Sequence, residues 1–131
     1  MRSSGSLVDT SVWIDFFKGV PSVKALLAKL IAEDRIFTAG PILFELMQGI
    51  KSSSEKTQVK EALLSTNYLE LSPDDWEGAA SLAHALRAKG ITIPMRDILI
   101  AHLAMSHDLE VISFDLHFEK VPGLKHHKPS F

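Results

Sequence analysis

The fold is decided by a short segment near the start of the chain, residues 6–17, which reads SLVDTSVWIDFF. Its first three residues are small or apolar and predict a short buried strand that ends at Asp9. Aromatic side chains then recur at helical spacing, at Trp13, Phe16 and Phe17, which predicts a helix over residues 12–17. A strand that passes through an acidic residue directly into a helix is typical of the first unit of an α/β fold.

The same alternation of strands and helices continues along the chain. Apolar runs predict strands at residues 35–39, 68–71 and 110–113, and helical spacing predicts helices at residues 23–31, 41–50, 52–64, 73–89 and 97–105. This order is typical of a mainly parallel sheet covered by helices on both faces. We therefore expect one domain over residues 6–124, a flexible start or cloning remnant at residues 1–5, and a disordered tail at residues 125–131.

Two of these helices have particularly clear signals. Ser72, Pro73 and Asp75 show the pattern of an N-cap, a proline in the first turn and a capping box. Residues 97–105 are apolar on nearly every side of the predicted helix. We therefore expect this last helix to be buried.

Composition excludes several classes of protein. The chain has 131 residues, of which 46% are apolar and 23% are charged, as in an ordinary globular domain. A net charge of −2 excludes nucleic-acid binding through bulk positive charge, and the lack of cysteine excludes disulfides, thiol nucleophiles and thiolate metal sites. No apolar run reaches the roughly 18 residues of a membrane helix, and no signal peptide opens the chain, so we expect a cytoplasmic protein.

Acidic residues lie at the edges of four apolar elements: Asp9, Glu45, Asp97 and Asp115. Asp9 and Asp115 follow predicted parallel strands, whose carboxyl ends form the ligand-binding edge of such a sheet. Each of the four acids also has a local explanation, namely helix capping, the helix dipole, exposure to solvent or a turn. These explanations are independent of one another, whereas one shared acidic site accounts for all four residues.

A shared site of this kind requires a cation. Two carboxylates about 4 Å apart repel each other by about 4 kcal/mol at an effective dielectric constant of about 20. Four clustered carboxylates must therefore bind a cation or hold protons near neutral pH. Oxygen ligands in a chain without cysteine favour a hard ion, Mg²⁺ or Mn²⁺. Such an ion activates water and neutralises phosphate, so the pattern indicates hydrolysis of phosphodiester bonds.

The four acids lie in motifs that resemble those of PIN-domain ribonucleases, in particular the VapC toxins of bacterial type II toxin–antitoxin modules. The first motif is LVDTSVWID at residues 7–15, and the second is ILFELMQG at residues 42–49. The third is PMRDILIA at residues 94–101, and the fourth is VISFDLHF at residues 111–118. Their order and spacing extend the resemblance over nearly the whole chain, from Leu7 to about Gly123.

The resemblance implies a three-layer α/β/α PIN fold and a metal-dependent endoribonuclease. The implied metal-binding and catalytic residues are Asp9, Glu45, Asp97 and Asp115. With Mg²⁺ or Mn²⁺ bound, an activated water would attack the RNA phosphodiester and leave 5′-phosphate and 3′-hydroxyl ends. Thr10, Ser11 and Ser113 are expected to orient carboxylates or a metal-bound water through hydrogen bonds. A cognate antitoxin and a second copy of the chain are the implied protein partners.

Two positions beside the acids have more than one interpretation. Many relatives have a further acid two residues after the last one, where this chain has His117. This histidine could tune the site, contact RNA or face solvent, and we expect it to face solvent. Arg96 could contact an RNA phosphate or offset the repulsion among the acids. The six histidines show no spacing typical of a zinc site.

Basic and aromatic residues suggest further contacts. Candidates for a rim that holds RNA phosphates are Lys18, Lys24, Lys29, Lys51, Lys56 and Lys60. Each of them also fits a solvated helix face. The aromatic residues Trp13, Phe16 and Phe17 fit either core packing or part of a surface gripped by the antitoxin.

The main alternative function is that of a non-catalytic PIN-like module that binds protein or RNA. The complete set of four acids argues against it. A phospho-acceptor domain is disfavoured because Asp74 and Asp75 begin a helix and do not follow an early strand. A phosphatase of the two-aspartate type is disfavoured because Ser11, and not a second acid, stands two residues after Asp9.

Overall fold

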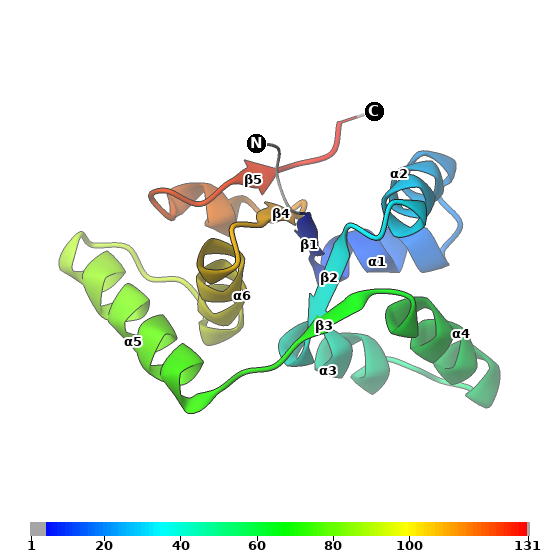
Figure 1. The fold of residues 1–131 in the computed structure, drawn as a ribbon, viewed down its shortest axis with the longest axis horizontal. Coiled ribbons are helices and arrows are strands. Elements are labelled where there is room, and N and C mark those ends of the chain that lie inside the picture. The colour runs from blue at the N-terminus through cyan, green and yellow to red at the C-terminus, as the bar shows by residue number, and fades with distance from the viewer. Residues whose placement is uncertain (1–4, 131) are drawn as a thin grey trace.

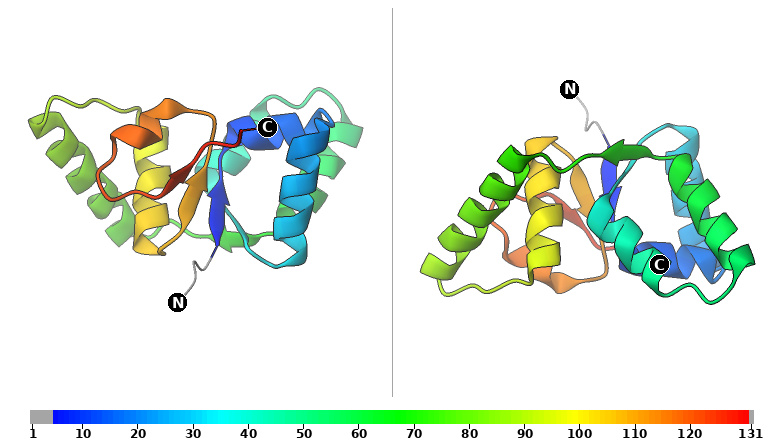
Figure 2. Two further views of the ribbon diagram at one scale, coloured as in Figure 1. Left: turned by 90° about the horizontal axis from the view of Figure 1, so that it is seen from above. Right: turned by 90° about the horizontal axis from the view of Figure 1, so that it is seen from below.

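The centre of the molecule is a sheet of five strands, seen here in a computed structural model that describes residues 5–130. The strands are β1 (Ser6–Val8), β2 (Ile36–Ala39), β3 (Asn67–Leu69), β4 (Glu110–Ile112) and β5 (His126–His127). Their order is β3-β2-β1-β4-β5, and every neighbouring pair is parallel. Figure 2 shows β1, β4 and β5 side by side and running in the same direction. The predicted parallel sheet is therefore confirmed.

Helices make the crossover connections that parallel strands require. They are α1 (Thr10–Phe17), α2 (Pro21–Ala32), α3 (Gly40–Gln48), α4 (Ser53–Leu64), α5 (Pro73–Ala88) and α6 (Met95–Ser106), with a short 3₁₀ helix, η1 (Leu116–Lys120), between β4 and β5. Figure 1 shows α5 and α6 on one side of the sheet and α1, α2 and α4 on the other. This arrangement is the expected three-layer α/β/α fold.

The strand order reverses at β1, which lies between β2 and β4. In open α/β sheets, ligands bind beyond the carboxyl ends of the strands at such a reversal. Val8 at the end of β1 lies opposite Ile112 at the end of β4. The next residue, Asp9, donates its backbone N–H to the Ile112 carbonyl at 2.9 Å. The loops after β1 and β4 therefore begin side by side at this edge.

Helix α6 lies at the centre of the core, as its sequence predicts. It packs against α5, β1 and β4. Its buried apolar residues are Ile98, Leu99, Ile100, Ala101, Leu103 and Ala104. Burial of one large apolar side chain contributes roughly 1.5–3 kcal/mol to folding, so this face fixes the position of the helix firmly. The one charged residue that α6 buries is Asp97.

Aromatic residues of α1 pack on one another and on the core. Trp13 is fully buried, and its ring centroid lies 5.4 Å from that of Phe16 and 5.8 Å from that of Phe17. Both phenylalanines are partly buried against the core. This packing fixes the helix that follows Asp9.

Helix α5 begins with the predicted capping box and packs closely on α6. The Ser72 hydroxyl accepts from the backbone N–H of Asp75 at 3.2 Å, and the Asp75 carboxylate accepts from the backbone N–H of Ser72 at 2.9 Å. One turn later, Gly78 faces the imidazole of His102 on α6 so closely that any Cβ at this position would collide with the ring. This contact explains why a glycine stands inside α5.

The expected disorder of the tail is wrong for residues 125–127, and residue 131 lies outside the described residues. Residues 126–127 form β5 beside β4, and the backbone N–H groups of Val111 and Ser113 donate to the carbonyls of Lys125 and His127 at 2.8 and 3.1 Å. The His126 side chain is 5% exposed and hydrogen-bonds the Ser113 carbonyl at 2.9 Å. The strand forms because β4 would otherwise present an unpaired edge.

The expected flexible start also reaches too far along the chain. Residues 1–4 lie outside the described residues, but Gly5 belongs to the fold. Its carbonyl accepts from the backbone N–H of Glu110 at 3.2 Å. Its φ of +155° and the close approach of Arg35 and Phe37 leave no room for a side chain.

Candidate metal centre

Four separate elements carry the predicted acids to the edge of the sheet where the strand order reverses. Asp9 follows β1 and precedes α1, and Asp115 follows β4 and precedes η1. Glu45 lies within α3, and Asp97 lies in the first turn of α6. Asp9 and Asp97 are 1% and 2% exposed, so their charges depend on partners inside the protein.

Arg96 joins three of these acids. Its Nη1 donates to Asp9 Oδ1 at 2.7 Å, and its Nε lies 3.2 Å from Glu45 Oε1. Its Nη2 lies 2.7 Å from Asp97 Oδ1. In the structure, Arg96 thus offsets repulsion among the acids, which is one of the two roles that the sequence left open. The planar guanidinium thus hydrogen-bonds Asp9 and lies within ion-pair distance of Glu45 and Asp97.

His117 joins the fourth acid to the same cluster. Its Nδ1 lies 3.0 Å from Asp97 Oδ2 and 3.1 Å from Asp115 Oδ1. The expectation that His117 faces solvent is wrong for this nitrogen, although 41% of the side chain is exposed. The turn of η1 explains the difference, because the Asp115 carboxylate accepts the backbone N–H of His117 at 2.9 Å and so folds the ring back over the site. The sequence marks this position as unusual but does not indicate where the side chain points.

Hydroxyl groups fix the carboxylates that Arg96 holds. Thr10 donates to Glu45 Oε1 at 2.7 Å, and Ser113 donates to Asp9 Oδ2 at 2.6 Å. The Ser113 hydroxyl also accepts from the backbone N–H of Asp115 at 2.9 Å. Ser11 has a different part, since its hydroxyl accepts from the backbone N–H of Phe114 at 3.3 Å and links α1 to the loop after β4.

The electrostatics of the site favour a bound cation. Burial raises the pKa of Asp97, and repulsion from Asp115 and Asp9 raises it further, against the opposing effects of His117 and Arg96. Burial alone would lower the pKa of Arg96, but its hydrogen bond to Asp9 and the charges of Asp9, Asp97 and Glu45 outweigh burial and raise it. Arg96 therefore stays charged, while Asp97 is left with an incompletely compensated charge.

The residues present fit a divalent metal ion. Asp97, Asp115 and His117 each offer a ligand atom, and these atoms lie within 4.8 Å of one another. Asp97 Oδ1 is buried and accepts no hydrogen bond from the described residues. Arg96 Nη2 lies 2.7 Å from this oxygen, but its N–H groups do not point at it. Carboxylate oxygens are the ligands that Mg²⁺ and Mn²⁺ prefer.

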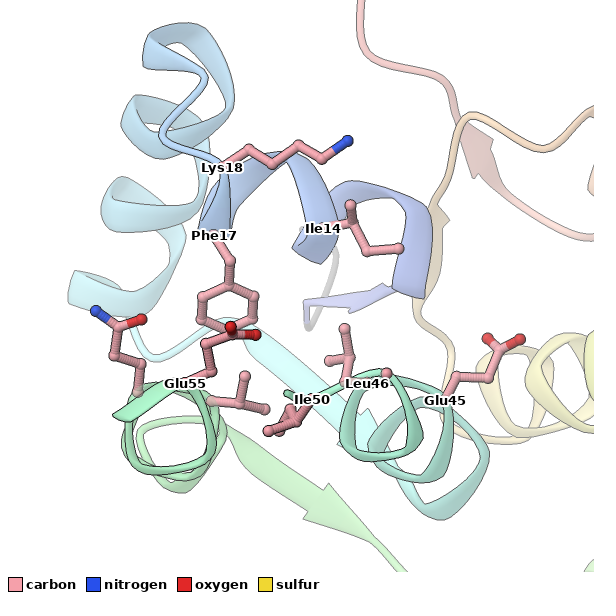
Figure 3. Close-up of a pocket in the computed structure, with 10 residues that line it drawn as sticks. Ile14, Phe17, Lys18, Glu45, Leu46, Ile50 and Glu55 are labelled. Carbon is pink, nitrogen blue, oxygen red and sulfur yellow. The ribbon is translucent and has the colours of Figure 1, made fainter. Parts of the chain in front are cut away.

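Two apolar hollows border Glu45. One, of about 380 Å³, lies between α1, α3 and α4, and Figure 3 shows Ile14, Phe17 and Leu46 in it, with Lys18 above. The other, of about 470 Å³, includes Phe44, Trp76 and Met95 and reaches Arg96. Of the lysines expected to form a basic rim, Lys18 lines the first hollow, and all the others are exposed as well: Lys24, Lys29, Lys51, Lys56 and Lys60.

The chain belongs to the PIN domain family, whose sequence model matches residues 6–124. It is similar to ribonuclease VapC19 of Mycobacterium tuberculosis, with 30% identity over 122 residues that span 91% of this chain and 96% of that protein. It is also similar to ribonuclease VapC11 of the same species, with 28% identity over 120 residues that span 88% of this chain and 90% of that protein.

Solved structures of the same shape come from several bacteria. A toxin–antitoxin complex from Klebsiella pneumoniae matches with a TM-score of 0.72 and 26% identity, over 92% of this chain and 95% of that one. The DNA-bound VapBC structure from Salmonella typhimurium matches with a TM-score of 0.82 and 22% identity, over 94% of this chain and 96% of that one. The second likeness concerns the fold alone. No helix in residues 5–130 is long and apolar enough to cross a membrane.

Proposed function

We propose that this protein is an endoribonuclease that depends on Mg²⁺ or Mn²⁺ and serves as the toxin of a toxin–antitoxin pair. The observation that carries the proposal is the meeting of four acids from four separate elements around Arg96 and His117. Burying Asp9 and Asp97 and bringing two further carboxylates close to them is costly for stability, so the cluster has to serve a purpose other than folding. The names of the similar proteins, ribonucleases of the VapC group, support RNA as the substrate.

The acids have distinct parts in this proposal. Asp97 and Asp115 would bind the ion, with Asp9 and Glu45 on the far side of Arg96 completing the negative site. When bound, the ion would lower the pKa of water and neutralise charge on the scissile phosphate. Thr10 and Ser113 hold the carboxylates in position, so little reorganisation is needed when RNA arrives.

RNA cleavage by the purified chain tests this proposal. We expect cleavage of single-stranded RNA with Mg²⁺ or Mn²⁺ and none with EDTA. Asp115→Asn should abolish cleavage but not RNA binding, whereas the exposed Asp108→Asn, a matched control on the α6–β4 loop, should cleave normally. RNA that is bound but never cut, with either ion, would instead favour the non-catalytic binding module.

The proposed antitoxin would cover the hollow between α1, α3 and α4. This hollow has an apolar lining and Lys18 at its edge, and Glu45 lies at its border, so an occupant would reach the proposed catalytic site. Expression of the chain with and without the neighbouring upstream reading frame tests the pairing. Growth arrest that the neighbour relieves would support the toxin role, and arrest that it leaves unchanged would contradict it.

The proposed homodimer has a candidate surface in the second hollow. Phe44 and Met95 are 68% and 70% exposed there, and Trp76 is 48% exposed. Exposed apolar side chains gathered at one place are typical of an interaction surface. A second copy of the chain that covers this surface would also close one side of the acidic site, since Glu45 and Arg96 line the same hollow.

A further inference from the structure

The ring nitrogen of His117 lies where a metal ligand would lie. Its distances to Asp97 Oδ2 and Asp115 Oδ1 are 3.0 and 3.1 Å. Around an octahedral ion with ligands at about 2.1 Å, neighbouring ligand atoms are about 3.0 Å apart. Both separations therefore match the edges of a coordination octahedron. They also match hydrogen bonds, in which Nδ1 must carry the hydrogen because both partners are carboxylates.

The position of His117 is fixed by its surroundings. Its backbone N–H is bound by Asp115, whose own backbone N–H is bound by Ser113. The next residue, Phe118, is fully buried and anchors η1 in the core. A ring held on such a turn meets an ion with little loss of conformational freedom, because most of that freedom is already lost on folding.

The ion can bind here without displacing Arg96. Asp97 divides its two oxygens between two nitrogen-bearing side chains, with Arg96 beside Oδ1 and His117 beside Oδ2. When the single hydrogen of the neutral imidazole is on Nε2, the lone pair of Nδ1 is free to bind an ion. Arg96 would stay in contact with Asp9 and Glu45, so the site would contain two positive groups, the ion and Arg96.

We infer that His117 Nδ1 is a metal ligand, together with Asp97 and Asp115, and that the site consequently prefers Mn²⁺ to Mg²⁺. The inference rests on the proposed metal dependence and adds one ligand and the choice of ion. An imidazole favours transition-metal ions, whereas Mg²⁺ prefers oxygen ligands and gives up its water reluctantly. An acid at this position, as the resemblance leads one to expect, would not make that distinction.

Electron paramagnetic resonance of bound Mn²⁺ tests the ligand directly. Echo-modulation spectra of the untagged protein should show a coordinated nitrogen, and His117→Ala should lose this signal. The matched control His84→Ala, at an exposed position on α5, should keep it. Titration calorimetry should show that His117→Ala weakens Mn²⁺ binding by at least about tenfold and Mg²⁺ binding by less than about threefold. His117→Asp should bind both ions with more nearly equal affinity.

The possible outcomes separate this inference from the proposed function. Bound Mn²⁺ without a nitrogen signal would overturn the role of His117 and leave the nuclease proposal in place. A nitrogen signal that persists in His117→Ala would also overturn it. Failure of the unmodified protein to bind either ion would contradict the proposed metal dependence itself.

Discussion

Replacing Arg96 by methionine tests how far one side chain stabilises the acidic cluster. The change keeps most of the length of the side chain and removes the charge that contacts three carboxylates. Asp9, which is 1% exposed, would keep Ser113 as a donor but lose its charged partner. Loss of one partner from a buried ion pair costs roughly 3–5 kcal/mol. Because 25% of the Arg96 side chain is exposed, we expect the lower end, about 3 kcal/mol.

Urea denaturation at neutral pH in EDTA measures this loss of unfolding free energy. The matched control is Arg35→Met, which removes an exposed ion pair with Glu33 at 3.5 Å and should cost at most about 1 kcal/mol. Arg96→Lys, which keeps the charge, should recover part of the stability and provides a folded variant if the methionine variant does not fold. A loss for Arg96→Met no larger than that of the Arg35 control would show that Arg96 does not stabilise the acidic cluster.

Three further predictions concern other parts of the molecule. Asp97→Asn should stabilise the protein in EDTA at neutral pH. The pKa of Asp97 is raised in the folded state above its usual value of 3.8, so the stability that this carboxyl contributes falls as the pH rises above 3.8. Thermal melts between pH 4 and 7 should show this fall in the unmodified protein and lose it in the variant. Gly78→Ala should cost roughly 1–3 kcal/mol in urea denaturation because its Cβ would collide with His102. Gly49→Ala should cost little, because its Cβ would meet only the backbone carbonyl oxygens of Glu45 and Leu46 at 4.0 Å, an ordinary contact distance. Equal losses for the two variants would contradict the structure. Phe44→Ser should shift the proposed dimer toward the monomer, as measured by light scattering after gel filtration. An unchanged dimer mass would exclude the surface around Phe44 as the dimer interface.

Much of the fold could be predicted because its elements carry local signals. The buried helix at residues 97–105 and the capping box at Ser72 and Asp75 are confirmed, because apolar periodicity and capping depend on neighbouring residues. The strand β5 could not be predicted in this way. It consists of His126 and His127, whose polarity suggests solvent, and it forms because the backbone of β4 offers unpaired donors and acceptors.

The acids of the candidate site could be proposed from sequence, but their partners could not. Each acid lies at the end or edge of an apolar element, which is visible without coordinates. Whether Arg96 turns toward its neighbours or toward solvent depends on a side-chain conformation set by Asp9 and Glu45, far away in the sequence. The direction of His117 depends on the short 3₁₀ helix that begins directly after Asp115.

Acids from separate elements are expected to bind a single divalent ion together. Anomalous diffraction from crystals grown with Mn²⁺ locates such an ion. We predict a peak at a coordination distance of about 2.1–2.3 Å from carboxylate oxygens of both Asp97 and Asp115. Ordered crystals in which these carboxylates are seen clearly, with saturating Mn²⁺ and no anomalous peak between them, would show that the acids do not share an ion.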